Sequence, residues 1–454
     1  MTLLDRTAEL AQEYLDELSE RQVAAPADFE TTLSALDQPL PESGSDAQGV
    51  IEELAGVVGA ATVASAGPRY FGFVVGGALP AALAVDWLTA AWDQMSFNQV
   101  SSPGVAAVEV VCERWVLDVL GLPGSACVGF ATGATGGNFV GVSAARHRLL
   151  ANEGWDVEAQ GLFGAPELRV LVGEEIHTSL LFALRMAGLG SERVERVESD
   201  GQGAMRADRL AETLASGTGP AIVCAQVGNV NTGASDPVGE IVTATRDYGP
   251  AWVHVDGAFG LWAAASPSLR HLVAGVETAD SWSLDAYKWL NVPYDSGMAI
   301  VADPASVHGA FGTSAAYLPG SAGREPGELV PEMSRRARAI PIYAALRTLG
   351  REGLADLVER CCAHARRLAG AMEALDGAEV LNDVALNQVL VRFKDEDAAT
   401  EAVMQAVRDE GDAWLAGTVW RGRGAARVAF SNHSTTDADV DRLAAAFKRA
   451  LAAV

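Results

Sequence analysis

Beginning near residue 105, short apolar runs alternate with longer stretches of helical spacing, and this alternation restricts the fold more than any other feature. Short apolar runs bounded by turn residues indicate buried strands, and strands that alternate with helices form mainly parallel sheets. We therefore expect an α/β fold with a mainly parallel central sheet flanked by helices. The predicted strands are ACVGFAT, LRVLVG, AIVCAQV, AWVHVD, SWSLD and GMAIVAD, and two predicted helices are NFVGVSAARHRLL and SLLFALRMAG.

The regions on either side of this alternation have different patterns. Residues 1–35 have the apolar spacing of one helix, and a polar linker with Pro and Gly separates them from a second helical stretch at 50–66. After residue 340 a long helical stretch precedes two sparser strands and a capped helix, TTDADVDRLAAAFKRALAAV. We expect three domains: a helical N-terminal segment (1–75), a large α/β domain (76–340) and a small C-terminal α+β domain (341–454).

Charge and composition restrict the kinds of partner that this protein can bind. Asp and Glu number 59 against 33 Lys and Arg, a net charge of −26, and such a surface repels phosphate backbones and anionic lipids. We expect neither a nucleic-acid nor a membrane partner, and no apolar run reaches the roughly 18 residues of a membrane span. The acidic N-terminus lacks the features of a signal peptide, which indicates a cytoplasmic protein. The five cysteines have no metal-like or disulfide-framework spacing, so we expect reduced thiols and no metal site.

Ligands of a parallel sheet bind beyond the carboxyl ends of its strands, and several polar residues follow apolar runs in this chain. The segment 131–146, ATGATGGNFVGVSAAR, is a turn of small residues that opens a helix. The free backbone N–H groups and the helix dipole at such a turn suit a phosphate group. The segment has neither GK[ST] nor GxGxxG. A tight connection from strand to helix is the alternative explanation of its small residues.

Asp256 ends the run AWVHVD, in which alternation places Trp252, His254 and Asp256 on one face. A carboxylate in apolar surroundings needs a partner, and one that fits is the protonated ring nitrogen of a pyridine cofactor. A helix N-cap and a metal ligand are the alternatives. His254 shares the face and is expected to support Asp256.

Lys288 is one of only three lysines, and it directly follows the buried run SWSLD. Burial favours the uncharged amine, which attacks aldehydes. The alternative, a lysine whose head group reaches water, fits Lys394 and Lys448 better. His177 follows the run LRVLVG and opens a helix, where an imidazole can lie flat on a planar ring, move a proton or cap the helix.

Together these features follow the order of a pyridoxal phosphate site: a phosphate turn, a histidine, a strand-ending aspartate and a lysine 32 residues later. From about residue 65 to the end the chain resembles the group II pyridoxal-phosphate-dependent decarboxylases, the aromatic-amino-acid and glutamate decarboxylase family of fold-type I. The resemblance rests on ATGATGGN, HTSL, GNVNTGASDPVGEI, WVHVDGAFG, DAYKWLNVPYDSG and RVAFSNHSTTDADV.

This resemblance implies a role for each matching residue. Lys288 would bind the cofactor covalently, Asp256 would pair with the ring nitrogen, and His177 and Ala258 would lie on the two faces of the ring; Lys288, His177 and Asp256 are the expected catalytic residues. The other residues expected at the cofactor are Gly133, Ala134, Thr135, Asn229 and Tyr287, the first three at its phosphate. The residues that match the substrate pocket of aromatic-acid decarboxylases are Phe71, Phe73, Met95 and Phe97.

The family implies decarboxylation of an L-amino acid to an amine and carbon dioxide, through an external aldimine and a quinonoid, by a homodimer with its active site at the interface. This chain departs from the family at three places. Tyr287 stands where His is common, and Asn229 follows Gly228 where hydroxyl residues are common. The segment 320–333 matches a loop whose tyrosine protonates the carbanion in animal aromatic decarboxylases, but it contains no tyrosine.

The missing tyrosine leaves His177, Tyr317 and Tyr294 as candidate proton donors and keeps other reactions open. An aldehyde synthase, a C–C lyase or a transaminase would use the same fold and cofactor. A non-catalytic cofactor-binding module is a more remote alternative, because it would not need Lys288. A nicotinamide dehydrogenase would need a glycine fingerprint that this sequence lacks. The sequence leaves the substrate side chain open.

Overall fold

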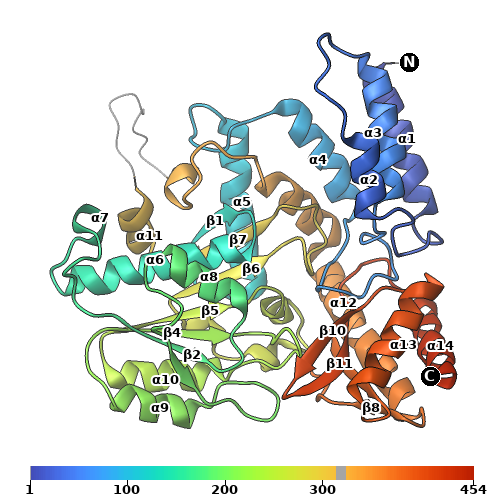
Figure 1. Ribbon diagram of the computed structural model, residues 1–454. Coiled ribbons are helices and arrows are strands. Elements are labelled where there is room, and N and C mark those ends of the chain that lie inside the picture. The colour runs from blue at the N-terminus through green and yellow to red at the C-terminus, as the bar shows by residue number, and fades with distance from the viewer. Residues whose placement is uncertain (1, 313–323) are drawn as a thin grey trace. The chain divides into compact units, whose positions relative to one another are not determined.

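Residues 2–312 and 324–454 are described by the computed structural model of the chain, and contacts separate them into two units (Figure 1). The larger unit contains residues 76–365 and 382–388, and the smaller contains 1–75, 366–381 and 389–454. The three domains expected from the sequence stay a prediction, because contacts do not show which parts fold independently. None of the described helices has the length and apolarity to cross a membrane. The cytoplasmic location also stays a prediction.

A seven-stranded sheet forms the centre of the larger unit. Its strands are β1 (Cys127–Ala131), β2 (Arg169–Gly173), β3 (Glu195–Val197), β4 (Ala221–Gln226), β5 (Ala251–Asp256), β6 (Ser281–Asp285) and β7 (Gly297–Val301). They lie in the order β1-β7-β6-β5-β4-β2-β3, and only β7 runs antiparallel to its neighbours. The mainly parallel sheet and all six predicted strands are confirmed. The sequence did not predict β3, because its residues Glu-Arg-Val form no apolar run.

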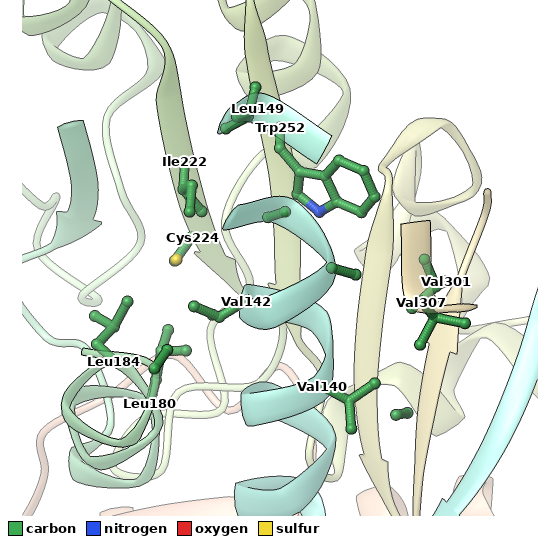
Figure 2. Packing of buried hydrophobic residues seen from close by; sticks show 14 of the residues in the cluster. Val140, Val142, Leu149, Leu180, Leu184, Ile222, Cys224, Trp252, Val301 and Val307 are labelled. Atoms are coloured by element: carbon green, nitrogen blue, oxygen red, sulfur yellow. The ribbon is translucent and has the colours of Figure 1, made fainter. Parts of the chain in front are cut away.

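Helices cover both faces of this sheet (Figure 1). The helices of the larger unit are α4 (Pro80–Trp92), α5 (Pro103–Leu120), α6 (Ala134–Asn152), α7 (Val157–Gln160), α8 (Thr178–Met186), α9 (Ala207–Ala215), α10 (Val238–Tyr248) and α11 (Pro304–Phe311), with short 3₁₀ helices at Gly260–Ala265, Arg270–Val273, Val276–Thr278 and Pro326–Glu328. Figure 2 shows the core beneath α6 and α8, where Val140, Val142, Leu180 and Leu184 pack with Ile222 of β4. Helix α10 packs on β4 and β5 and also contacts α9.

Helix α6 lies close to β5, β6 and β7 because glycines face these strands. A Cβ atom at Gly137 would lie 2.6 Å from the carbonyl oxygen of Met298, and one at Gly141 would lie 2.5 Å from the imidazole of His254. Side-chain carbon atoms do not approach other atoms so closely, so only glycine allows this helix position. The first turn of α6 therefore reaches the carboxyl ends of β5 and β6.

The smaller unit combines helices with a second sheet. Its helices are α1 (Leu3–Glu17), α2 (Phe29–Leu36), α3 (Ala47–Ala60), α13 (Asp397–Glu410) and α14 (Asp437–Ala453), and its strands are β8 (Ala378–Val380), β9 (Gln388–Phe393), β10 (Ala416–Trp420) and β11 (Arg423–Ala429). The strand order is β10-β11-β9-β8. Helix α12 (Ala339–Glu373) begins in the larger unit, has a non-helical residue at Gly350 and ends in the smaller unit. The C-terminal α+β region and its capped last helix, which starts at Thr436, are confirmed.

The single helix expected over residues 1–35 is wrong, since α1 ends at Glu17 and α2 starts at Phe29. Pro26 lacks a backbone N–H and disfavours helix at the residue before it. Asp28 then starts a new helix, because its carboxylate accepts a hydrogen bond from the backbone N–H of Thr31 at 2.8 Å.

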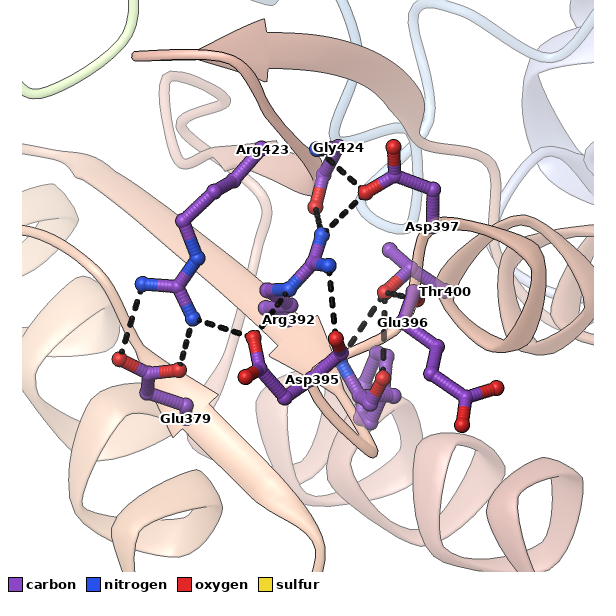
Figure 3. A network of polar contacts seen from close by, with 9 residues as sticks. Glu379, Arg392, Asp395, Glu396, Asp397, Thr400, Arg423 and Gly424 are labelled. Carbon is purple, nitrogen blue, oxygen red and sulfur yellow. Dashed lines mark hydrogen bonds and ion pairs between the residues drawn. The ribbon is translucent and has the colours of Figure 1, made fainter.

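Ion pairs shape the turn between β9 and α13 in the smaller unit (Figure 3). The Arg392 guanidinium donates to Asp395 Oδ1 at 2.9 Å and to Asp397 Oδ1 at 2.5 Å, and Arg423 donates to the same Asp395 oxygen at 2.8 Å. Lys394 and Asp395 both have a φ of 52°, which is unfavourable for residues other than glycine. The two arginines thus hold a turn that the backbone alone would resist.

Candidate active site

Asp256 lies at the carboxyl end of β5 beneath the first turns of α6, and it is 3% exposed. Its Oδ2 accepts a hydrogen bond from Asn138 Nδ2 at 3.0 Å. Its Oδ1 accepts from the backbone N–H of Ala258 at 3.2 Å and from Ser283 Oγ at 3.3 Å. All three donors are neutral, and none of the ion pairs found among the described residues includes Asp256. The site therefore contains a buried carboxylate that has no cationic partner among the described residues.

Lys288 follows the end of the next strand, β6, and forms a buried ion pair there. Its Nζ lies 2.9 Å from Asp285 Oδ2, and the side chains are 15% and 2% exposed. Asp285 Oδ1 also accepts the backbone N–H of Ala134, at the start of α6, at 2.5 Å. A negative side chain at a helix N-terminus is stabilised by the helix dipole. One carboxylate thus joins the lysine to the predicted phosphate turn.

Two tyrosine rings lie next to this ion pair. The ring centroids of Tyr287 and Tyr294 are 4.4 Å apart, and Tyr287 is hydrogen-bonded to Asp285. Burial and the nearby Asp285 carboxylate raise the pKa of Tyr294 to about 12 and raise that of Tyr287 even further. Both phenols are therefore protonated at neutral pH, and the raised pKa makes each a weaker acid than a free tyrosine. Tyr294 is 62% exposed.

Thr135 and His177 line the same cavity of about 750 Å³, together with residues of α8. This cavity runs along α8 and residues 191–196, and neither Lys288 nor Asp256 lines it. His177 also caps α8, because its Nδ1 accepts from the backbone N–H of Ser179 at 3.2 Å. His177 therefore caps α8, as one of the alternatives proposed, and it also lines a cavity together with Thr135 of the predicted phosphate turn.

Asn229 lies in the turn after β4 and is 1% exposed. Its Oδ1 accepts the backbone N–H groups of Asn231 at 2.8 Å and Thr232 at 3.2 Å, which closes the turn. Its Nδ2 is buried and has no hydrogen-bond partner within the described part of the chain. A buried donor of this kind favours an acceptor from outside the chain. Its predicted contact with a cofactor stays a prediction.

His254 lies behind Asp256 on the expected face, but Asn138 stands between them, since His254 Nε2 is 2.8 Å from Asn138 Oδ1. Sequence reasoning missed Asn138 and Asp285. Asp285 ends a buried strand as Asp256 does, so the same rule could have found it. Asn138 was harder to find, because its role depends on which strand residues the helix covers.

The four predicted pocket residues lie in different surroundings. In the smaller unit, Phe71 is 1% exposed and packs against Phe430, whereas Phe73 is 57% exposed. In the larger unit, Met95 is 40% exposed and Phe97 packs against Gly327. Their role in a substrate pocket stays a prediction.

The loop expected near 320–333 is described only from residue 324 onward, and Tyr317 lies outside the described residues. Among the residues that are described, no cluster of three or more His, Cys, Asp or Glu side chains could hold a metal ion.

Comparison with known proteins identifies the family. The family model described as "Pyridoxal-dependent decarboxylase conserved domain" matches residues 30–394. Tryptophan decarboxylase 1 of Oryza sativa subsp. japonica is 29% identical over 400 residues, which cover 80% of this chain and 76% of the relative. Aromatic-L-amino-acid decarboxylase of Bacillus atrophaeus is 24% identical over 452 residues, which cover 95% and 91% of the two chains.

Solved structures share the fold over nearly the whole chain. The crystal structure of Oryza sativa TDC with PLP and tryptamine has a TM-score of 0.92 at 24% identity, with 99% of this chain and 97% of the other covered. The crystal structure of Rhodiola rosea 4-hydroxyphenylacetaldehyde synthase has a TM-score of 0.89 at 19% identity, with the same shares covered.

The ion pair between Lys288 and Asp285 gives a test that needs no ligand. We expect Asp285→Asn to destabilise the protein by about 3 kcal/mol, because it leaves a buried ammonium group without its countercharge. The double variant with Lys288→Met should lose about 2 kcal/mol less than the sum of the single variants. Urea unfolding of the cofactor-free protein measures these values.

The exposed pair of Arg193 and Glu167, with side chains 71% and 76% exposed, is the control. Removing both of its members should cost the sum of the single changes to within about 0.5 kcal/mol. Additive losses at Lys288 and Asp285 as well would contradict a coupled buried pair.

Proposed function

Because this chain belongs to the family of pyridoxal-dependent decarboxylases, we propose that it releases carbon dioxide from an L-amino acid with an apolar or aromatic side chain, with Lys288, Asp256 and His177 as catalytic residues. Family membership makes pyridoxal 5′-phosphate the cofactor and amino-acid decarboxylation the reaction, and it confirms the resemblance seen in the sequence. The observation that carries the residue assignment is the buried Asp256 carboxylate at the end of β5, which has only neutral donors around it, together with the Lys288 amine that follows the neighbouring strand β6.

The residues present fit the functional groups of this cofactor. A protonated pyridine nitrogen supplies the cation that Asp256 lacks, and Lys288 supplies the amine that would hold the aldehyde. Ala258, whose backbone N–H binds Asp256, and His177 are proposed to enclose the ring. We assign the phosphate to Gly133, Ala134 and Thr135, at the start of α6.

Asp285 already occupies one of the backbone donors that we assign to the phosphate. Its carboxylate accepts the Ala134 N–H that a phosphate would use, which supports an anion at this helix N-terminus but also adds a second negative charge. The same carboxylate holds the Lys288 amine by a 2.9 Å contact. We therefore propose that Asp285 orients the Lys288 amine until the cofactor binds.

When bound, the cofactor supplies an electrophilic aldehyde and a protonated ring that accepts the electron pair of a breaking Cα bond. The chain must hold the ring proton and deliver another proton to the substrate carbon. Asp256 performs the first task because a carboxylate stabilises the pyridinium charge. For the second task the described candidates are His177, which lines the cavity, and Tyr294, whose phenol is protonated at neutral pH.

An aldehyde synthase is the second candidate function. It is favoured by the absence of tyrosine from residues 320–333. Such an enzyme also releases carbon dioxide, but it consumes oxygen and water and forms an aldehyde, ammonia and hydrogen peroxide instead of an amine. The products therefore separate the two functions.

We also propose that two copies of this chain form a homodimer. The helices α1, α2 and α3 contain no fully buried residue, and Leu4, Phe29 and Leu40 are 76%, 73% and 93% exposed. An exposed apolar surface of this kind marks a protein contact. A second copy is the occupant that the family resemblance implies.

Lys288 should be the only lysine that binds the cofactor covalently. Borohydride reduction of the protein with pyridoxal phosphate, followed by peptide mapping, should label Lys288, and Lys288→Arg should abolish the label because a guanidinium does not add to the aldehyde. Lys394→Arg and Lys448→Arg are matched controls at exposed positions and should keep the label. Label at another residue would contradict the assignment.

The products of the wild-type protein should be an amine and carbon dioxide in equal amounts. The measurement is chromatography of amines together with assays of carbon dioxide and ammonia across the common L-amino acids. We expect aromatic substrates to react at least tenfold faster than acidic ones, because the surface charge of −26 disfavours anions. Carbon dioxide accompanied by ammonia and aldehyde would instead establish the synthase.

Sedimentation velocity should give twice the chain mass of 47.3 kDa for the wild type. Combining Phe29→Glu with Leu33→Glu on α2 should shift the protein toward one chain mass, because buried charges destabilise an apolar contact. Phe163→Glu, at a 99% exposed side chain of the larger unit, is the control and should leave the dimer intact. A monomeric wild type would contradict the proposed dimer.

A further inference from the structure

A continuous chain of hydrogen bonds runs beneath α6 and ends at Asp256. Trp252 Nε1 donates to Ser281 Oγ at 2.8 Å, and the same Ser281 oxygen lies 2.8 Å from His254 Nδ1. His254 Nε2 lies 2.8 Å from Asn138 Oδ1, and Asn138 Nδ2 donates to Asp256 Oδ2 at 3.0 Å. All five side chains are at least 96% buried.

Only one direction of proton donation satisfies every link of this chain. The indole of Trp252 can only donate, and an ionised Asp256 can only accept. Asn138 therefore turns its Nδ2 to Asp256 and its Oδ1 to His254, so His254 Nε2 must carry a proton. Burial lowers the pKa of His254 to about 4, so the ring is neutral and its Nδ1 accepts the hydroxyl proton of Ser281.

We infer that Trp252, Ser281, His254 and Asn138 form a positioning relay, which holds the Asn138 amide with its Nδ2 toward Asp256 and thereby keeps a neutral donor on the carboxylate that is proposed to pair with the ring nitrogen of the cofactor. This inference rests on the proposed pairing of Asp256 with the pyridine ring. It assigns a role to four residues that do not touch the cofactor in that proposal.

The relay fixes which way the amide group of Asn138 is oriented. The oxygen and the NH₂ group of an amide are nearly equal in size, so packing alone does not choose between them. With the opposite orientation, Oδ1 would face the Asp256 carboxylate and repel it. The Nε2–H of His254 prevents this, because it needs an acceptor and only Oδ1 provides one.

Packing fixes the imidazole that makes this choice. The ring lies beneath Gly141, where a Cβ atom would be 2.5 Å away, and its two nitrogens contact β6 and α6. The relay consists of neutral groups only. A cation at the position of Asn138 would compensate the Asp256 charge and compete with the pyridinium, whereas a neutral donor leaves that charge for the cofactor.

Two substitutions at position 254 separate the relay from simple packing. The Nε2 of glutamine reaches the place of the imidazole Nε2, whereas asparagine reaches only the place of Nδ1. His254→Gln should bind pyridoxal phosphate within about twofold of the wild type, and His254→Asn should bind it about tenfold more weakly, because Asn138 Oδ1 loses its donor. Titration of the cofactor-free proteins, followed by absorbance, measures both affinities.

Nitrogen-15 NMR of the cofactor-free wild type tests the relay without the cofactor. The spectrum at pH 7.5 should contain a neutral ring protonated at Nε2, and this signal should be absent from His254→Gln. If the signal that His254→Gln removes belongs instead to a ring protonated at Nδ1, or at both nitrogens, the relay is overturned.

If His254→Gln and His254→Asn bind pyridoxal phosphate with equal affinity, the inference that the relay supports cofactor binding is overturned. A wild type that binds no pyridoxal phosphate would overturn the proposed function, and the role of the relay with it, whereas the NMR result reports on the hydrogen bonds alone.

Discussion

The close contact between α6 and the strands β5 and β6 is the constraint on which the candidate site depends. Gly137 and Gly141 allow it, because any side chain there would collide with Met298 or His254. The contact brings Asn138 within hydrogen-bond distance of Asp256 and brings the start of the helix to the end of β6. A helix held a side chain's width further away would remove the Asn138 donor from Asp256 and the Ala134 N–H from Asp285.

The two carboxylates beneath this helix are compensated in different ways. Asp285 has a cation, Lys288, and a helix N-terminus. Asp256 has three neutral donors and no cation in the described structure. Since both are almost fully buried on neighbouring strands, the difference in their partners sets their chemistry. Asp285 is already paired within the chain, whereas Asp256 retains the capacity to bind a positive group.

Much of this arrangement could be predicted from the sequence, because it follows from local patterns. Apolar runs located the parallel strands, and the rule that ligands bind beyond strand ends pointed to Asp256 and Lys288. The partners across the sheet could not be predicted in this way. Asn138 acts on Asp256 only because the helix crosses β5 at that turn, and periodicity along one segment carries no information about such a crossing. The break near Pro26 was missed because the expected helix was extended to residue 35 from apolar positions that end at Leu18.

The lysine itself gives the strongest reason to see chemistry in this site. The ion pairs of the described residues otherwise use arginine or histidine, and Lys394 and Lys448 are exposed. An arginine would bind the Asp285 carboxylate through two parallel hydrogen bonds, so it would make a better structural partner than an amine. What arginine cannot do is lose its proton and attack a carbonyl carbon. The use of an amine in this pair, where a guanidinium would bind the carboxylate more strongly, therefore supports our proposal that Lys288 is present for its reactivity.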